Sequence, residues 1–152
     1  MSKSIGILGV GTYLPPEIRK NDWWPEHTTR KWQERAARAV ERARADLDSA
    51  PTEGARKAAE AILALAKDPF QGSRERRVMA ADMKASDMET LAAKEAIARS
   101  GIPQEEIDLV LSYTMIPDYI NVPSACVVHG NLGLKERCTT MAVDAVCNSF
   151  LM

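Results

Sequence analysis

The chain has 152 residues, enough for one domain, and its apolar content of 45% and charged content of 27% are ordinary for a soluble globular protein. The net charge is −1 and basic residues are mixed with acidic ones, so composition favours neither a nucleic-acid nor a membrane-surface protein. Three cysteines without CxxC spacing argue against a disulfide framework and a zinc site.

The sequence contains neither an apolar run long enough to cross a bilayer nor a cleavable signal peptide. A bilayer needs about 20 consecutive apolar residues, and no stretch approaches that length. We therefore expect a reducing, cytoplasmic setting.

The first element predicted is a buried strand over Ser4–Val10, SIGILGV. The turn GTYLPP follows it. The glycine spacing weakly suggests a dinucleotide-binding loop. That interpretation is rejected because Pro15 and Pro16 stand where the phosphate-binding helix would begin.

Two helices are predicted next, over Thr28–Ser49 and about Thr52–Lys67. Pro51 separates them, and each has an alanine-rich apolar stripe, so the pair forms an αα-hairpin. A charged, alanine-rich hairpin is usually an outer layer. Three tryptophans gather at its entrance, where they either pack ordinarily or face a ligand channel: Trp23, Trp24 and Trp32.

A loop over Asp68–Ala81 carries the arginines Arg74, Arg76 and Arg77. Such a cluster can bind phosphate through bidentate contacts, although a solvated run of charges is the more common explanation. A capping box from Ser86 to Glu89 is then predicted to begin a helix that ends at Gly101 in the left-handed conformation.

The region that follows predicts an α/β sheet. Ile107–Thr114 is expected to be a buried strand, and a strand, a helix and a parallel strand form the crossover unit of such sheets. A short helix is predicted over Ser124–Leu132, with Pro123 at its first turn and Gly133 at its end. His129, among valines in this helix, is interpreted as a packed or surface residue.

Thr139–Val146 is predicted to be a fully buried strand because it is rich in β-branched and small apolar residues. Cys147 follows it at the start of a predicted buried helix. Backbone N–H groups and the helix dipole at such a turn favour thiolate over thiol, which activates a nucleophile. The alternative, that Cys147 is a small core residue, stays open on this stretch alone.

Taken in order, these segments resemble the amino-terminal half of the ketoacyl-ACP synthase III family, in the thiolase superfamily. The resemblance rests on the motifs YLP, GSRERR, SGI, IDLVLSYT, VPSACVVHGNLGLK and VCNSF, and covers most of the chain except about Trp24–Lys67. It implies that residues 1–152 form the amino-terminal half of a thiolase-like α/β domain, a βαβ sheet with buried helices. Residues 24–67 are then an inserted helical hairpin, and the carboxy-terminal half is missing from this chain.

The resemblance implies that Cys147 is the acyl-accepting nucleophile of a ping-pong condensing enzyme. A malonyl thioester then loses carbon dioxide and gives a 3-ketoacyl product, in fatty acid, polyketide or related secondary-metabolite biosynthesis. CoA or phosphopantetheine thioesters are substrates, with no tightly bound cofactor and no metal. The expected donors are acyl-CoA or an acyl carrier protein.

The decarboxylation step of the family needs a histidine and an asparagine from the carboxy-terminal half. Neither His27 nor His129 matches that histidine. We therefore expect a second chain to complete a cleaved or split enzyme, with a truncated polypeptide as the alternative, and a homodimer of the whole enzyme.

The resemblance also suggests binding residues. Arg74 and Arg76 match the family loop beside the CoA and pantetheine entrance, but the tryptophan that stacks on adenine has no clear equivalent, since Phe70 is not a safe substitute. A carrier protein is therefore the expected donor or acceptor. Val122 stands where many relatives place a phenylalanine across the dimer interface, and its smaller side chain predicts an acyl chain longer or bulkier than acetyl.

Two departures from the family pattern keep other functions open. Ala142 and Ser149 replace an aspartate and a glycine around the cysteine, while Asp144 lies three positions before it. The turn is therefore expected to be shaped differently, and acyl transfer to an oxygen or nitrogen nucleophile is an alternative to condensation. A non-catalytic partner subunit is a third hypothesis. The hairpin is predicted to cover the substrate entrance.

Overall fold

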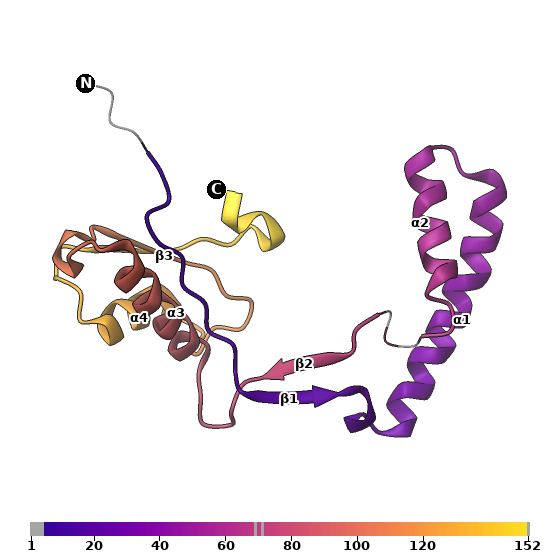
Figure 1. The fold of residues 1–152 in the computed structure, drawn as a ribbon, viewed down its shortest axis with the longest axis horizontal. Helices are drawn as coiled ribbons and strands as arrows, with labels where there is room; N and C mark the ends of the chain where they lie inside the picture. Colours follow the sequence, from indigo (N-terminus) through magenta and orange to yellow (C-terminus); the bar gives the residue numbers. More distant parts are fainter. Residues whose placement is uncertain (1–4, 69, 71, 152) are drawn as a thin grey trace. The chain divides into compact units, whose positions relative to one another are not determined.

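The computed structural model describes residues 5–68, 70 and 72–151. The chain divides into two compact units (Figure 1). The first comprises the described residues of Met1–Pro16 and Met79–Met152, and the second comprises Glu17–Val78. We refer to the second as the hairpin unit and to the first as the sheet unit.

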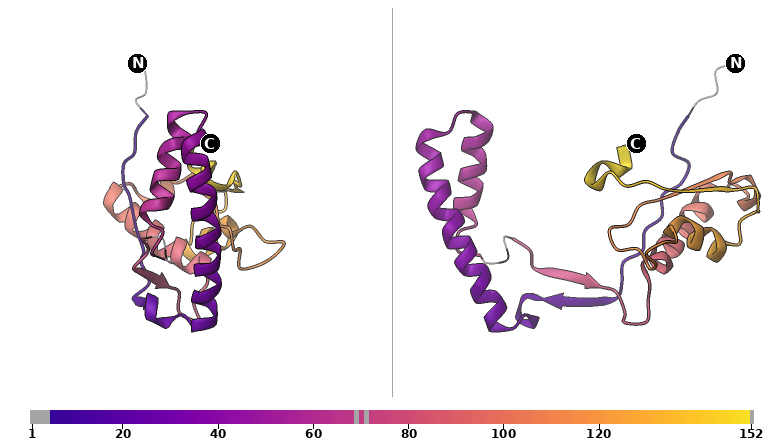
Figure 2. Two further views of the ribbon diagram at one scale, coloured as in Figure 1. Left: turned by 90° about the vertical axis from the view of Figure 1, so that its right-hand side faces the viewer. Right: turned by 180° about the vertical axis from the view of Figure 1, so that it is seen from behind.

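The hairpin unit contains the two predicted helices, α1 (Glu26–Ser49) and α2 (Glu53–Ala64). They pack side by side, as both views in Figure 2 show. Ala43 and Ala59 are the buried residues of the two helices, because small side chains allow the helices to approach closely. The prediction of an αα-hairpin is confirmed, although α2 ends at Ala64 instead of Lys67.

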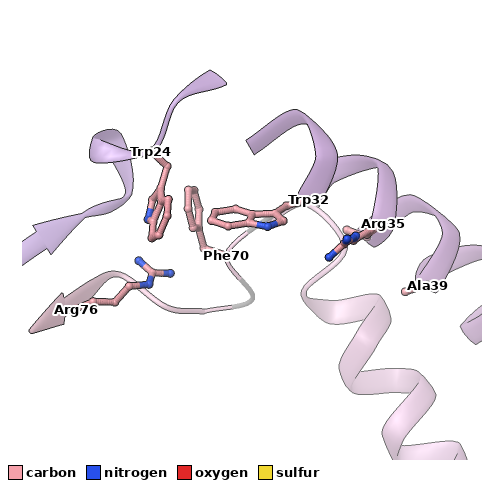
Figure 3. Close-up of a pocket in the computed structure, with 7 residues that line it drawn as sticks. Trp24, Trp32, Arg35, Ala39, Phe70 and Arg76 are labelled. Atoms are coloured by element: carbon pink, nitrogen blue, oxygen red, sulfur yellow. The ribbon is translucent and has the colours of Figure 1, made fainter. Parts of the chain in front are cut away.

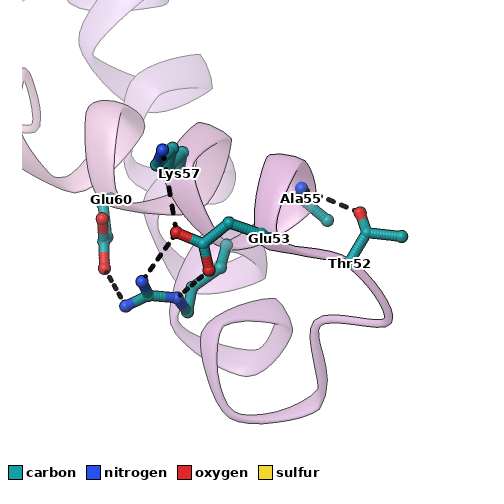
Figure 4. A network of polar contacts seen from close by, with 6 residues as sticks. Thr52, Glu53, Ala55, Lys57 and Glu60 are labelled. Carbon is teal, nitrogen blue, oxygen red and sulfur yellow. Dashed lines mark hydrogen bonds and ion pairs between the residues drawn. The ribbon is translucent and has the colours of Figure 1, made fainter.

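The start of α2 explains where the hairpin turns. Thr52 is the N-cap, and its hydroxyl accepts a hydrogen bond from the Ala55 N–H at 3.1 Å. Arg56 pairs with Glu53 at 2.9 Å and with Glu60 at 2.8 Å along the exposed face (Figure 4). Pairs with this helical spacing stabilise a helix by only a few tenths of a kcal/mol each.

A two-stranded antiparallel sheet completes the hairpin unit. β1 (Glu17–Lys20) pairs with β2 (Glu75–Val78), and Glu17 lies opposite Val78. A short 3-10 helix, η1 (Asn21–Trp23), follows β1. The sequence interpretation of Asp68–Ala81 as a loop throughout is wrong, because β2 lies within it. The charged segment ERRV has little strand propensity, so pairing with β1, far away in sequence, decides its structure.

The sheet unit is built on a parallel crossover. β3 (Leu109–Ser112) pairs with β4 (Thr139–Ala142), and α4 (Ser124–Leu132) connects them. The predicted strands and helix are therefore present in the predicted order, but both strands are shorter than predicted. A 3-10 helix, η2 (Gln104–Glu106), precedes β3, and another, η3 (Val146–Leu151), follows β4.

The core of this unit lies between the helices and one face of the sheet. Its buried members are Val128, Leu132, Leu134 and Cys138, and half-buried residues of α3 (Ala85–Ser100) pack on them together with Val110. Cys138 is thus a core residue. The opposite sheet face is open: Leu109, Leu111 and Met141 are 47%, 57% and 51% exposed. The prediction that these strands are fully buried is wrong, because the described residues cover only one face of the β3–β4 sheet.

The predicted strand Ser4–Val10 is not formed over its described residues, 5–10, while Ser4 lies outside the described residues; this correction also has a packing reason. Ile5 and Ile7 are exposed, and among described residues no strand pairs with this segment. The chain instead crosses α3 through glycines. A Cβ atom on Gly11 would lie 1.9 Å from the Ala92 carbonyl oxygen, so only glycine permits this approach.

The ends of α3 and α4 test the predicted caps. Gly101 and Gly133 close the two helices with φ of 69° and 64°, as predicted. The Ser86 capping box is wrong, because α3 begins at Ala85 and Ser86 is buried within it. The Asp87 carboxylate accepts from the Lys84 N–H at 2.9 Å, and Asp118 accepts from the Ala85 N–H at 2.9 Å.

Candidate functional site

Cys147 lies beyond the carboxyl end of β4, as the second residue of η3, and is exposed. The sequence predicted a cysteine between a strand and a helix, and the structure has that order. The predicted buried α-helix is not present there: η3 is a six-residue 3-10 helix. Cys147 is exposed, so its thiol is accessible to a substrate. A cysteine packed in the core, the alternative interpretation, would be buried.

Side chains hold the backbone around Cys147 in a defined turn, which we call the nucleophile turn, Asp144–Ser149. The Ala145 N–H donates to Ser149 Oγ at 2.8 Å, and that hydroxyl donates to the Val146 carbonyl at 2.9 Å. The Val146 N–H donates to Asp144 Oδ1 at 3.1 Å. Ser149 is one of the two positions at which the sequence departs from the family pattern, and Asp144 lies three positions before the cysteine, so both features noted in the sequence shape this turn.

Val146 adopts a φ of 52°, the left-handed region that β-branched residues avoid. It is the single non-glycine residue with positive φ among the residues described. Such conformations store about 1–3 kcal/mol and persist where surrounding bonds enforce them. The bonds of Asp144 and Ser149 therefore set the position from which Cys147 projects.

Tyr113 lies just beyond β3 and interacts electrostatically with two residues of the nucleophile turn, Asp144 and Cys147. Loss of solvent around Tyr113 raises the pKa of its hydroxyl, and the nearby Asp144 and Cys147 raise this pKa further. Tyr113 and Asp144 also line a cavity of about 290 Å³ beside the carboxyl ends of β3 and β4. Asp144 therefore belongs to the nucleophile turn, lines this cavity and acts on the pKa of Tyr113, which lines the cavity too.

Val122 lies on the wall of this cavity and is 44% exposed. Cys147 is not among the residues that line it. Val122 and Asp144 thus line the same cavity. That an acyl group on the Cys147 sulfur would reach Val122 stays a prediction. The buried Ser124, at the first turn of α4, lines the same cavity, and its hydroxyl has no partner among the described residues.

A buried polar group beneath the sheet was missed in the sequence. Ser112 donates to Glu89 Oε2 at 2.5 Å, while Glu89 Oε1 is buried without a described partner. Burial raises the pKa of Glu89, the Ser112 hydrogen bond opposes this, and the negative charge of Asp118 adds to the rise. Glu89 was interpreted as part of a capping box, and no local sequence signal indicates that its carboxylate reaches β3.

Arg74 and Arg76 lie in the hairpin unit, whereas Cys147 lies in the sheet unit. Arg74 is exposed. Arg76 donates to Asn21 Oδ1 at 2.8 Å, and its guanidinium lies 5.4 Å from the Phe70 ring centroid and 5.9 Å from that of Trp24. Their suggested role at a pantetheine entrance stays a prediction.

The predicted tryptophan cluster is confirmed. Trp24 contacts Trp23 and Trp32 edge to face at 4.8 and 5.0 Å between centroids, and Trp32 contacts Phe70 at 5.5 Å. The sequence placed the tryptophans at the hairpin entrance, but not Phe70 and Arg76 beside them.

Other candidate residues have structural contacts. His129 Nε2 lies 3.1 Å from the Lys135 carbonyl oxygen, in keeping with the predicted packing role. Within the described ranges, no group of three or more His, Cys, Asp or Glu residues could hold a metal ion. None of the described helices is both long and apolar enough to cross a membrane.

Comparison with solved structures identifies the fold. The structure matches OleA from Xanthomonas campestris: a histidine-to-asparagine variant superposes with a TM-score of 0.62 and 25% identity over 95% of this chain and 35% of that chain. The same variant with cerulenin gives a TM-score of 0.61 at 25% identity. The mixed α/β chain therefore matches part of a thiolase fold.

Sequence comparison is more specific. Beta-ketoacyl-[acyl-carrier-protein] synthase III from Sulfurovum sp. (strain NBC37-1) is 44% identical over 81 residues, and that from Helicobacter pylori (strain G27) is 37% identical over 81 residues. No family model matches. Over about half of its length the chain is thus a relative of the ketoacyl-ACP synthases III of the thiolase superfamily, as the sequence motifs indicated.

The matched region is limited in extent. It covers 53% of this chain and 24% of each of these two relatives, so the chain spans about a quarter of their length. The assignment of residues 24–67 as an insertion in the fold stays a prediction.

Proposed function

We propose that Cys147 is the acyl-accepting nucleophile of an acyl-thioester condensing enzyme. The observation that carries this proposal is an exposed thiol on a held, strained turn that directly follows the parallel β3–α4–β4 unit. Its support from outside the chain is the relationship to ketoacyl-ACP synthases III.

The first half-reaction is acyl transfer. The Cys147 thiolate attacks the carbonyl carbon of an acyl thioester, a new C–S bond forms, the C–S bond to CoA or to a carrier protein breaks, and the thiolate of that donor leaves. The Cys147 N–H is one donor to the developing oxyanion, a contribution of about 3 kcal/mol in comparable enzymes. The exposure of Cys147 permits this approach.

The second half-reaction requires groups that this chain does not supply. A malonyl thioester loses carbon dioxide, and its carbanion attacks the acyl-cysteine to release a 3-ketoacyl thioester. His129 Nε2 lies beside the Lys135 carbonyl oxygen, and neither His129 nor His27 falls at the position of the family histidine. We therefore infer that a histidine and an asparagine outside this sequence complete the site. The open sheet face at Leu109, Leu111 and Met141 is suited to pack against that complement.

We further infer that the acyl donor or acceptor is borne on a carrier protein, and that the acyl chain is longer than acetyl. The first inference rests on the missing adenine-stacking tryptophan of the family loop, and the second on the small side chain of Val122 in its cavity. A preference that peaks at two carbons would contradict the second inference.

The decisive experiment is intact-mass measurement after incubation of the chain with acyl-CoA or an acyl carrier protein. We expect one acyl addition, located at Cys147 and lost in Cys147→Ala. Cys126 is the matched control, because it is also an exposed thiol and lies outside the nucleophile turn, beside Thr140. Cys126→Ala should acylate normally, and acylation that survives Cys147→Ala would refute the proposal.

A second measurement separates condensation from other acyl transfers. When the chain is supplied with its complement and a malonyl thioester, condensation releases carbon dioxide. Formation of an ester or amide without that release would replace condensation by acyl transfer to oxygen or nitrogen. A chain that never gains the acyl mass would instead be a non-catalytic partner.

A further inference from the structure

The hairpin unit contains an aromatic cavity that the proposed chemistry does not use. Its volume is about 510 Å³, and its walls include Trp24, Trp32, Phe70, Arg35 and Arg76 (Figure 3). The rings meet edge to face, so they form a firm apolar wall rather than separate side chains. Such a wall can bury the apolar part of a ligand.

The two arginines at this cavity, Arg35 and Arg76, have no carboxylate partner among the described residues. Arg76 is half-buried, and its hydrogen bond at 2.8 Å is to the neutral amide oxygen of Asn21. That bond fixes the guanidinium beside Phe70 and Trp24, while leaving its charge available to an anion.

An alkyl cavity of about 330 Å³ adjoins the aromatic cavity. The two share Ala36 and Ala39 of α1, and the alkyl cavity continues between α1 and α2 along Val40, Ile62 and Leu65. All residues that line it are aliphatic. Ile62 and Leu65 are 42% and 41% exposed, so this apolar surface is open to an alkyl chain.

A common face of α1 connects the two cavities. Trp32, Ala36, Ala39 and Val40 recur at helical spacing, so a ligand lying along this face passes from the rings to the alkyl cavity. Alanine at the two shared positions leaves space that larger side chains would fill. The hairpin unit thus has a fixed cation at one end of a groove and an aliphatic surface at the other.

We propose that the hairpin unit binds an alkyl carboxylate, a free fatty acid. Its carboxylate pairs with Arg76, with Arg35 at the rim, and its chain follows Trp32 and Ala39 towards Val40, Ile62 and Leu65. A thioester of a saturated fatty acid has no free carboxylate, so its acyl part lacks the group that Arg76 recognises, and a malonyl thioester has the carboxylate but no alkyl chain for the aliphatic surface. The proposal does not depend on acyl transfer at Cys147.

Tryptophan fluorescence of the full chain measures this binding directly, because all three tryptophans of the protein lie in this unit. Titration with dodecanoate should give a saturable change. Affinity should rise by about fourfold for each methylene group from octanoate to dodecanoate. Dodecanol, which keeps the chain and lacks the charge, should bind at least about tenfold more weakly than dodecanoate.

Variants locate the site. Arg76→Gln should weaken dodecanoate binding by about tenfold, because the charge-assisted contact is lost. Arg38→Gln is the matched control: it removes an exposed arginine of α1 that lines neither cavity, and should leave affinity unchanged. Ala39→Leu fills the shared wall and should weaken binding of dodecanoate with Arg76 intact.

The outcomes are decisive even if one variant folds poorly. Far-UV circular dichroism checks each variant, and Ala39→Leu tests the groove if Arg76→Gln loses helix. The proposal is overturned by a non-saturable titration, by dodecanol binding as tightly as dodecanoate, or by Arg38→Gln weakening binding as much as Arg76→Gln. Acylation of Cys147 is measured separately by mass, so failure here leaves that result unaffected.

Discussion

Replacing Ser149 by alanine tests whether the nucleophile turn positions Cys147. The change removes two hydrogen bonds, from the Ala145 N–H at 2.8 Å and to the Val146 carbonyl at 2.9 Å. Each contributes about 1 kcal/mol net. Together they are comparable with the roughly 1–3 kcal/mol stored by the left-handed Val146. Without them, the turn should relax and carry Cys147 out of position.

The expected result is acylation of Cys147 slowed by up to about thirtyfold, since the two hydrogen bonds together contribute about 2 kcal/mol and each 1.4 kcal/mol corresponds to about a factor of ten. Two readouts are needed. Intact mass over time gives the acylation rate, and hydrogen exchange gives the protection of the Ala145 amide, which should be lost. Ser149→Thr keeps the hydroxyl and should restore both readouts, so it separates the hydrogen bonds from side-chain size.

Ser49→Ala is the control for loss of a serine hydroxyl elsewhere. Ser49 donates to the Ala45 carbonyl at 3.1 Å near the end of α1, in the hairpin unit, and its removal should leave acylation unchanged. If Ser149→Ala acylates at the normal rate while the Ala145 amide stays protected, the turn is held by other contacts and the reasoning fails.

Two further predictions concern stability. Gly11→Ala should lower the free energy of unfolding by about 1–3 kcal/mol in urea titration, because its Cβ would lie 1.9 Å from the Ala92 oxygen. Gly6→Ala, with nothing within 4 Å, should change it by under about 0.5 kcal/mol, and equal effects would refute the packing. The Glu89→Gln variant should become more stable relative to the wild-type protein as pH rises above 4.5. Burial raises the pKa of Glu89, so ionising this carboxyl in the folded wild-type protein costs stability, and the variant has no such group. The side-chain amide that replaces the carboxyl can still accept from the Ser112 hydroxyl, and a pH-independent difference between the proteins would count against this account.

Local sequence patterns predicted the helices well. The stripes of α1 and α2, Pro51 between them and the glycines that end α3 and α4 are signals within a few residues of one another. Helical hydrogen bonds join residues four apart, so such patterns contain most of the necessary information.

Strands and caps were predicted less well, because their partners are distant in sequence. β2 forms in a charged segment only because β1 pairs with it, and Ile5–Val10 forms no strand although its composition favours one. Asp118, which accepts hydrogen bonds at the start of α3, is far from that start in the sequence.

For the candidate site, the sequence alone determined the family relationship and the position of Cys147 directly after a strand, whereas the buried helix predicted to follow is a 3-10 helix. Only the tertiary structure decided that the thiol is exposed, that Asp144 and Ser149 hold a strained Val146, and that Arg76 lies among aromatic rings. The physical reason is that motif order depends on chemistry along the chain, whereas exposure, strain and ring contacts depend on which distant side chains the fold brings together.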